Sequence, residues 1–325
     1  MIADNYVDFR FLPHQKMLVR KENYGDQGLY DLKEDTLILP IKYESIQVFR
    51  DQPKLIKVVK DVGNNQMQVG LMDEEGKEVL PVNYAEIEAL DASTFLLHKR
   101  DSLYYSYSVE DHKKEKLPFT KVILNDSTSL WSVQKNEKMY LYDYKRKKLL
   151  LNKGYSKIQQ LKNGNFIVIQ KDSANQLKFG YANADGKLIV PVVYDTKETL
   201  FYPILEFERY LLLSKEDKAT GKMLEGFASF EGKILVPPHF DKVYPEENGN
   251  GFLTIKNNRY GVITADGREL LKTLYIIGIY GRFNSRTQEM SFKFPVPFER
   301  EGVWKFMNEE GTIVPIKAKD LILFQ

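Results

Sequence analysis

One spacing constrains this chain more than any other: a glycine and a proline lie eleven positions apart on either side of a short polar turn. A fixed spacing that recurs along a chain indicates a structural repeat, because each copy folds as the same supersecondary unit. The spacing occurs three times, at Gly70 and Pro81, Gly180 and Pro191, and Gly226 and Pro237.

The repeat covers nearly the whole chain once weaker copies are included. Five copies align directly, a sixth lacks the proline, and two eroded copies fill the gap in the middle. Their separations run from about 34 to about 46 residues, which is room for about four short strands. The eight anchor residues are Gly28, Gly70, Tyr104, Tyr140, Gly180, Gly226, Gly261 and Gly302.

The turn inside each copy predicts a β-hairpin. Gly76, Gly186 and Gly267 follow an acidic residue between two alternating apolar runs, and glycine there supplies the positive φ of a tight hairpin turn. The proline removes a ladder donor, so we expect it to end the following strand. An aromatic residue such as Tyr194 comes next, and we expect it to pack under the next turn.

The anchor glycine lies inside a predicted strand. Glycine weakens a strand and usually marks a bulge or a close backbone approach, so we expect neighbouring repeat units to touch at this position. Four aromatic residues recur at a second repeat position, and we expect them to form the core between units rather than a surface that stacks sugars or bases. They are Phe95, Trp131, Phe166 and Phe252.

These patterns predict an all-β repeat fold of about eight four-strand units in a single domain, residues 1–325. A β-propeller of seven or eight blades is favoured, and an open β-solenoid is the alternative. Strand-like segments at 7–12 and 321–324 fit either a closure, in which one terminus completes the other's sheet, or caps on an open array. No segment keeps a 3.6-residue period over ten residues, so little helix is expected.

Composition excludes several kinds of chemistry. The chain has no cysteine, so it has no thiolate nucleophile, disulfide or Cys-ligated metal. Its net charge is only +2, which creates no long-range field for a nucleic acid. The sequence shows neither the pattern of a signal peptide nor a long apolar run. We therefore expect a cytoplasmic protein without nucleic-acid or membrane partners.

The sequence contains no motif that supports catalysis or cofactor binding. The four histidines do not have metal-ligand spacing. The acidic clusters at 73–75 and 309–310 fall at predicted hairpin turns. The Gly249–Gly251 segment lacks the helix and the lysine of a phosphate-binding loop. We therefore expect no enzyme activity, no cofactor and no metal.

One copy shows a pattern that resembles the WG, or KWG, β-repeat family of bacterial proteins. It reads Phe179-Gly180, then Asp185-Gly186, Ile189-Val190-Pro191 and Tyr194-Asp195. The resemblance implies a β-repeat fold and interaction roles, and it implies no catalytic residues. In our alignment the defining tryptophan is absent from every copy, and its place is taken by other residues, namely Phe179, Tyr260, Val69, Gln27, Glu225 or Glu301.

Two segments stand out as candidate partner-binding surfaces. The basic run Lys145, Arg146, Lys147 and Lys148 lies at the turn of an eroded copy; it is either a patch for an acidic partner or a set of solubilising hairpin tips. Residues 282–300 form an inserted arm with Phe292 and Phe294, and insertions in repeat proteins often collect on the binding face.

The predicted function is a non-enzymatic protein–protein interaction module, such as an adaptor or an immunity-type binding protein. A carbohydrate- or small-ligand-binding propeller is the alternative, followed by a propeller hydrolase. The sequence does not indicate an oligomeric state.

Overall fold

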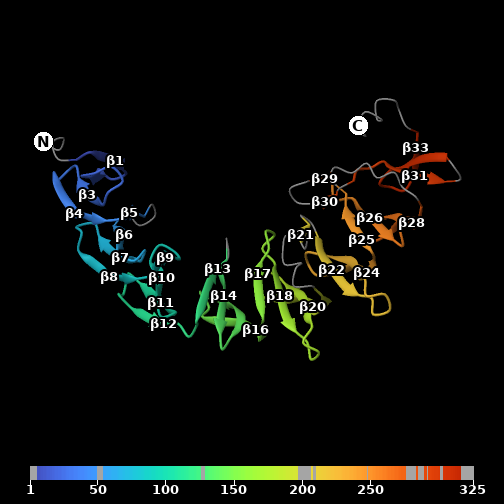
Figure 1. Ribbon diagram of the computed structural model, residues 1–325, viewed down its shortest axis with the longest axis horizontal. Helices are drawn as coiled ribbons and strands as arrows, with labels where there is room; N and C mark the ends of the chain where they lie inside the picture. Colours follow the sequence, from blue (N-terminus) through green and yellow to red (C-terminus); the bar gives the residue numbers. More distant parts are fainter. Residues whose placement is uncertain are drawn as a thin grey trace. The chain divides into compact units, whose positions relative to one another are not determined.

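The computed structural model describes most of the chain as a series of small β-sheets (Figure 1). All regular structure in the described ranges is β-strand, and each four-stranded sheet holds its strands in chain order. This confirms the all-β repeat fold. The described residues are 6–49, 54–125, 129–196, 206–207, 210–246, 248–275, 283–284, 289–290, 292–300 and 303–315.

The chain divides into two compact units, residues 1–122 and 123–325, and the division falls within strand β13. Unit 1 holds three four-stranded sheets. Sheet 1 comprises β1 (Asp8–Leu12), β2 (Lys16–Arg20), β3 (Gln27–Asp31) and β4 (Thr36–Tyr43); sheet 2 comprises β5 (Ser45–Val48), β6 (Leu55–Asp61), β7 (Met67–Asp73) and β8 (Glu78–Tyr84); sheet 3 comprises β9 (Glu86–Ala89), β10 (Thr94–Lys99), β11 (Leu103–Ser108) and β12 (Lys114–Lys116).

Unit 2 continues with sheets 4 to 8 and a two-stranded sheet between sheets 7 and 8. Sheet 4 comprises β13 (Lys121–Leu124), β14 (Leu130–Lys135), β15 (Lys138–Asp143) and β16 (Lys148–Tyr155); sheet 5 comprises β17 (Lys157–Gln160), β18 (Phe166–Lys171), β19 (Leu177–Ala182) and β20 (Leu188–Asp195); sheet 6 comprises β21 (Glu206–Phe207), β22 (Tyr210–Glu216), β23 (Met223–Ser229) and β24 (Ile234–Phe240); sheet 7 comprises β25 (Lys242–Pro245), β26 (Gly251–Lys256), β27 (Arg259–Thr264) and β28 (Glu269–Tyr275); the small sheet comprises β29 (Phe283–Asn284) and β30 (Glu289–Met290); sheet 8 comprises β31 (Val296–Arg300), β32 (Val303–Met307) and β33 (Ile313–Val314).

The N-terminal strand completes its own sheet. β1 pairs with the next strand, β2, through five consecutive residue pairs from Asp8↔Arg20 to Leu12↔Lys16. The N-terminal segment is therefore the first strand of sheet 1, as its similarity to the strand after the repeat's aromatic residue predicts. Residues 321–324, the other predicted end strand, lie outside the described residues, and a closed propeller stays a prediction.

The third strand of each sheet carries the anchor position of the repeat. Six of the eight predicted anchors lie there as expected, and the pairing register corrects the other two. In sheet 3 the equivalent residue is Tyr105, which faces Leu97, and not Tyr104. In sheet 8 it is Lys305, which faces Phe298, while Gly302 lies outside the described residues. The number of residues between the anchor and the following hairpin turn sets the register. Alignment of the copies by their glycines or tyrosines therefore misplaced the anchor in these two sheets.

The anchor glycine approaches the next strand of its own sheet. A Cβ on Gly180 would lie 2.5 Å from the carbonyl oxygen of Val190 on β20, a distance that no side chain tolerates. The register explains the crowding, because the pairing jumps from Phe179↔Tyr194 to Tyr181↔Val190. An advance of two residues along β19 thus corresponds to an advance of four residues along β20, and the extra residues of β20 form a bulge. The expectation that neighbouring units touch at this glycine was wrong.

The repeat's proline lies inside this bulge and does not end the strand. β20 continues through Pro191 as far as Asp195, past the aromatic Tyr194. Proline lacks an N–H for the ladder, but a bulge on an edge strand needs none there, and β20 is the last strand of its sheet. The prediction that the strand ends at the proline was therefore wrong. The bulge that accommodates the proline is also what crowds the anchor glycine.

The turn glycines have the predicted backbone and a second role. Their φ angles are positive, at 82° for Gly76 and 90° for Gly267, which confirms the hairpin turns. A Cβ on Gly76 would also lie 2.5 Å from the carbonyl oxygen of Ile38, and one on Gly267 would lie 2.7 Å from that of Leu235. Ile38 and Leu235 belong to the last strand of the preceding sheet. The turn glycine is thus a place where neighbouring repeat units touch.

Within each compact unit, a sheet that lies between two others buries both faces, one against the preceding sheet and one against the following sheet. We call these the leading face and the trailing face, and we use the same names for the equivalent faces of the other sheets. On sheet 5 the leading face includes Phe166 and Val168, which pack with Leu141 of sheet 4. The trailing face includes Phe179 and Tyr181.

The same contact recurs at all six described junctions, between sheets 1 and 2, 2 and 3, 4 and 5, 5 and 6, 6 and 7, and 7 and 8. The four recurring aromatics are all buried on leading faces, which confirms them as core residues: they are Phe95, Trp131, Phe166 and Phe252.

Candidate interaction surfaces

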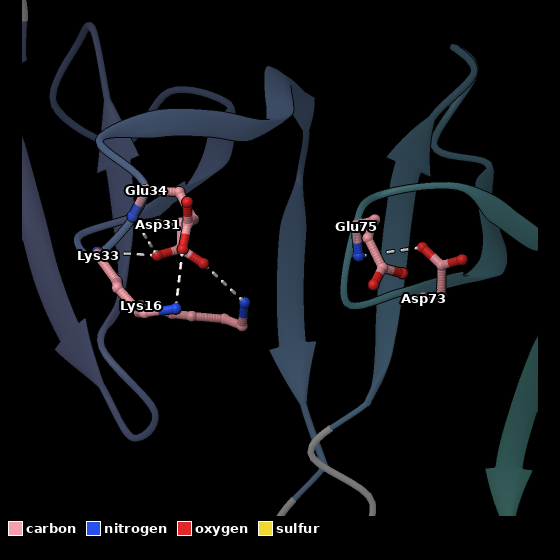
Figure 2. Close-up of polar contacts among 6 residues, drawn as sticks. All are labelled: Lys16, Asp31, Lys33, Glu34, Asp73 and Glu75. Carbon is pink, nitrogen blue, oxygen red and sulfur yellow. Dashed lines mark hydrogen bonds and ion pairs between the residues drawn. The ribbon is translucent and has the colours of Figure 1, made fainter.

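A polar side chain at the end of the third strand organises the hairpin turn in seven of the sheets. In sheet 1, Oδ1 of Asp31 accepts hydrogen bonds from the backbone N–H groups of Lys33 at 2.8 Å and Glu34 at 3.1 Å. In sheet 2, Oδ1 of Asp73 accepts from the backbone N–H of Glu75 at 3.1 Å (Figure 2). Oxygens at the same position accept turn N–H groups in five further sheets, from Asp143, Asn183, Ser229, Thr264 and Asn308.

Acidic residues at these turns, such as Asp31, serve the turn as charged hydrogen-bond acceptors. The backbone N–H of Glu34 is the main cause that lowers the pKa of Asp31, and Lys16, whose Nζ lies 3.4 Å from Oδ2, adds to it (Figure 2). Because the hydrogen bonds favour the charged carboxylate, the aspartate holds the turn best when it is ionised. Asp73 and Glu75 likewise serve a turn.

The predicted basic run forms one of these turns. Lys145, Arg146 and Lys147 connect β15 to β16, which Lys148 begins, and all four side chains are exposed. The backbone N–H of Arg146 donates to Oδ1 of Asp143 at 3.1 Å, and its guanidinium lies 3.5 Å from Oδ2. The structure therefore brings these four residues together at an exposed tip, with a carboxylate beneath them.

A shallow pocket of about 200 Å³ lies beside the basic turn. Lys145 and Arg146 line it together with Asp143, and Ala184 and Asp185 of the next hairpin turn complete the wall. The lining, which also includes Ser129 and Leu130, carries two carboxylates and two cations, so the pocket favours no particular charge on a ligand.

The described end of the inserted arm, residues 292–298, contributes to a hydrophobic core. Phe292 is 5% exposed and packs with Val296 and Phe298 against Leu253 of sheet 7. Phe294 is half-buried in the same cluster, with its ring centroid 5.6 Å from that of Phe292. Both phenylalanines therefore help to join sheet 8 to sheet 7, and Phe292 is not available to a partner. Arg282, the first residue of the predicted arm, lies outside the described residues.

Sheet 1 exposes apolar side chains on its leading face. Phe9 and Phe11 on β1 are 57% and 65% exposed, and their rings meet edge to face with centroids 5.7 Å apart. They face Val19 and Met17 on β2, both buried. Directly paired residues lie on the same face of a sheet, so the exposed surface is the β1 side of the leading face.

The same position is buried in the sheets that have a neighbour on this side. Phe9 corresponds to Ile46 on β5, because each pairs with the second-strand valine that faces the anchor glycine. Ile46 is 6% exposed and packs in the core shared with sheet 1. Two further equivalents, Ile87 and Ile158, are 0% and 4% exposed. Sequence reasoning missed this surface, although an apolar strand at the start of the chain indicates it.

On the opposite face, sheet 8 exposes one aromatic side chain. Trp304 on β32 directly precedes Lys305, the anchor position of sheet 8. It therefore corresponds to Phe179, which precedes Gly180. Trp304 is 51% exposed, whereas Phe179 is 0% exposed. The trailing face of sheet 8 thus displays an aromatic ring that sheet 5 buries against sheet 6.

The repeat of this chain matches a known family over one copy. Residues 226–260 match the WG containing repeat. The match begins at Gly226 on β23 and ends at Tyr260 on β27, so one sequence repeat extends from the third strand of sheet 6 to the third strand of sheet 7. This confirms the resemblance to the WG β-repeat family at that copy.

The pairing register also changes where the family's tryptophan is found. Trp304 precedes the anchor position of sheet 8, which is the tryptophan's place in the motif. The expectation that every copy lacks the tryptophan, with Glu301 in its place in the last copy, was therefore wrong for sheet 8. The error arose because Gly302 was taken as the anchor three residues too early.

Three solved structures show weak overall likeness. A eukaryotic initiation factor is 11% identical with a TM-score of 0.37, and the match covers 97% of this chain and 88% of that one. BamB from Moraxella catarrhalis is 13% identical with a TM-score of 0.30, over 78% and 77%. Hsv2 from Kluyvelomyces marxianus is 8% identical with a TM-score of 0.32, over 91% and 97%. Among curated protein sequences, none matches this chain.

Two further features are absent from the described part of the chain. No group of three or more His, Asp or Glu side chains there is placed to hold a metal ion. The same residues contain no helix that could span a membrane.

Proposed function

We propose that this protein is a non-enzymatic protein–protein interaction module, of the adaptor or immunity type, that works in the cytoplasm. The β-repeat fold and the WG repeat support an interaction role. The observation that carries the proposal is the exposed β1 side of the leading face of sheet 1, which carries Phe9 and Phe11.

The chemistry of this surface suits a protein partner. Burial of one phenylalanine side chain stabilises a complex by about 1.5–3 kcal/mol, and aromatic anchors often dominate the binding energy of an interface. The core of a protein interface is typically rich in aromatic side chains and poor in charged ones, which is the composition of Phe9 and Phe11 beside Val19 and Met17.

A photo-crosslinking phenylalanine analogue at Phe9 tests this proposal in cells of the organism that makes the protein. We expect the analogue at Phe9 to crosslink to one defined protein, which mass spectrometry identifies. The matched control carries the same analogue at Tyr24, an aromatic residue in the turn between β2 and β3 that is 97% exposed. Crosslinks that are equal at Tyr24 and Phe9, or absent at both, would refute the proposal.

A further inference from the structure

We propose that the partner of this surface is a second copy of the same chain, which docks the trailing face of its sheet 8 onto the leading face of sheet 1. This inference rests on the proposed function, because it names the occupant of the surface that the function requires. The result is a head-to-tail contact between chains that repeats the contact between sheets within each compact unit.

The repeat itself indicates what fits the leading face. At all six described junctions a leading face packs against the trailing face of another repeat sheet. On sheet 2, Ile46 and Val58 of the leading face meet Leu29, Leu39 and Tyr43 of sheet 1. The surface around Phe9 is built at the same repeat positions, so a trailing face of this kind matches its shape and chemistry.

The chain itself carries a trailing face of this kind with an exposed aromatic ring. On sheet 8, Trp304 and Phe306 both lie on this face, because they are two residues apart on β32. Trp304 is 51% exposed, whereas Phe306 is buried. The corresponding pair on sheet 5, Phe179 and Tyr181, is completely buried against sheet 6. One copy of the chain therefore offers both halves of a junction, Phe9 with Phe11 on sheet 1 and Trp304 on sheet 8.

A contact between two different faces is heterologous. Each chain that joins through one face keeps its other face free, so association continues from chain to chain unless it closes into a ring. Self-association should therefore increase with concentration and go beyond the dimer. An exposed charge on either face should stop it, because an unpaired carboxylate buried in the contact is costly.

Sedimentation velocity with the full chain tests the inference through Phe9→Asp, Trp304→Asp and their mixture. Over an about hundredfold range of concentration we expect the wild type to shift to larger species and each variant alone to stay monomeric. An equimolar mixture should form a dimer and nothing larger, because each variant keeps the face that the other has lost. Phe9→Leu and Trp304→Phe are the conservative controls and should still associate.

Two results would overturn the inference. The first is a wild type that stays monomeric at every concentration, and the second is a mixture that contains no dimer. If the wild type is monomeric and Tm also falls in both aspartate variants, the junction lies within one chain. If the wild type is monomeric while Phe9 still crosslinks to another protein, the proposed function stands and only this inference fails.

Discussion

Sheets 1 and 3 lie in the same compact unit and have the same strand order, but they differ in what covers their leading faces. Phe9 on β1 and Ile87 on β9 occupy the same repeat position, each opposite the second-strand residue that faces the anchor. Phe9 is 57% exposed and Ile87 is fully buried against sheet 2. The comparison teaches that burial at this position depends on the neighbouring sheet and not on the residue pattern.

The largest expected difference in unfolding free energy is between the variants Ile87→Ala and Phe9→Ala. Ile87→Ala leaves a cavity between sheets 2 and 3 and should cost about 2–5 kcal/mol of unfolding free energy. Phe9→Ala removes a mostly exposed ring from a dilute chain and should change stability by less than about 0.5 kcal/mol. Urea unfolding followed by tryptophan fluorescence and circular dichroism measures both. Equal losses would show that the leading face of sheet 1 is covered within the chain.

A second comparison concerns the two glycine turns at the ends of strand β7. Gly63 and Gly76 have positive φ angles of 88° and 82°, so alanine at either position suffers the left-handed penalty of about 1–2 kcal/mol. Alanine at Gly63 meets nothing within 4 Å, whereas at Gly76 its Cβ would lie 2.5 Å from the carbonyl oxygen of Ile38.

Gly76→Ala should therefore cost about 1–3 kcal/mol more than its matched control Gly63→Ala, because the turn is forced away from sheet 1. Chemical denaturation of the two variants under the same conditions measures the difference. If both lose the same free energy, the turn glycine serves only its backbone conformation and not the junction between sheets.

The smallest expected effect concerns the turn carboxylate of Asp31 and its dependence on pH. Hydrogen bonds from the backbone N–H groups of Glu34 and Lys33, together with Lys16, lower the pKa of Asp31 in the folded chain. The stabilisation is therefore complete above the unfolded pKa of about 3.9 and is lost as the pH falls through the lowered folded pKa. It should not change between pH 6 and pH 8.

Asp31→Asn keeps an acceptor oxygen at the turn, as Asn183 does naturally in sheet 5. At pH 7 we expect this variant to lose about 0.5–1 kcal/mol, because the ion pair with Lys16 is gone. Below about pH 4 its unfolding free energy should fall less steeply than that of the wild type. Urea unfolding at several pH values measures both slopes, and identical slopes would contradict the lowered pKa.

The sequence predicted the hairpins well because their signals are local. Asp185-Gly186 between two apolar runs requires a positive φ at one residue, and no distant contact can change that requirement. The buried aromatics such as Phe166 were also predictable, since equivalent positions of a repeat share one environment when each unit has neighbours on both sides. For the same reason the acidic cluster at 73–75 was correctly assigned to a turn.

The errors have a common cause in contacts between strands. Gly180 and Pro191 are eleven residues apart in the sequence, but the bulge of β20 brings the carbonyl oxygen of Pro191 within 2.7 Å of where a Cβ on Gly180 would lie. Neither residue alone indicates that contact. Phe292 was predicted to face a partner for a similar reason, because an aromatic residue in an insertion looks the same whether it is exposed or packed.

The amino-acid sequence by itself determined the repeat, the turn positions and the strand alternation, since each of these depends on the backbone preferences of a few adjacent residues. Only the tertiary structure decided which glycine joins the sheets, where the anchor of sheet 8 lies and which face remains exposed. The physical reason is that these properties belong to pairs of strands and pairs of sheets. Phe9 and Ile87 share one repeat position, and they differ because Ile87 packs against sheet 2 whereas Phe9 is exposed.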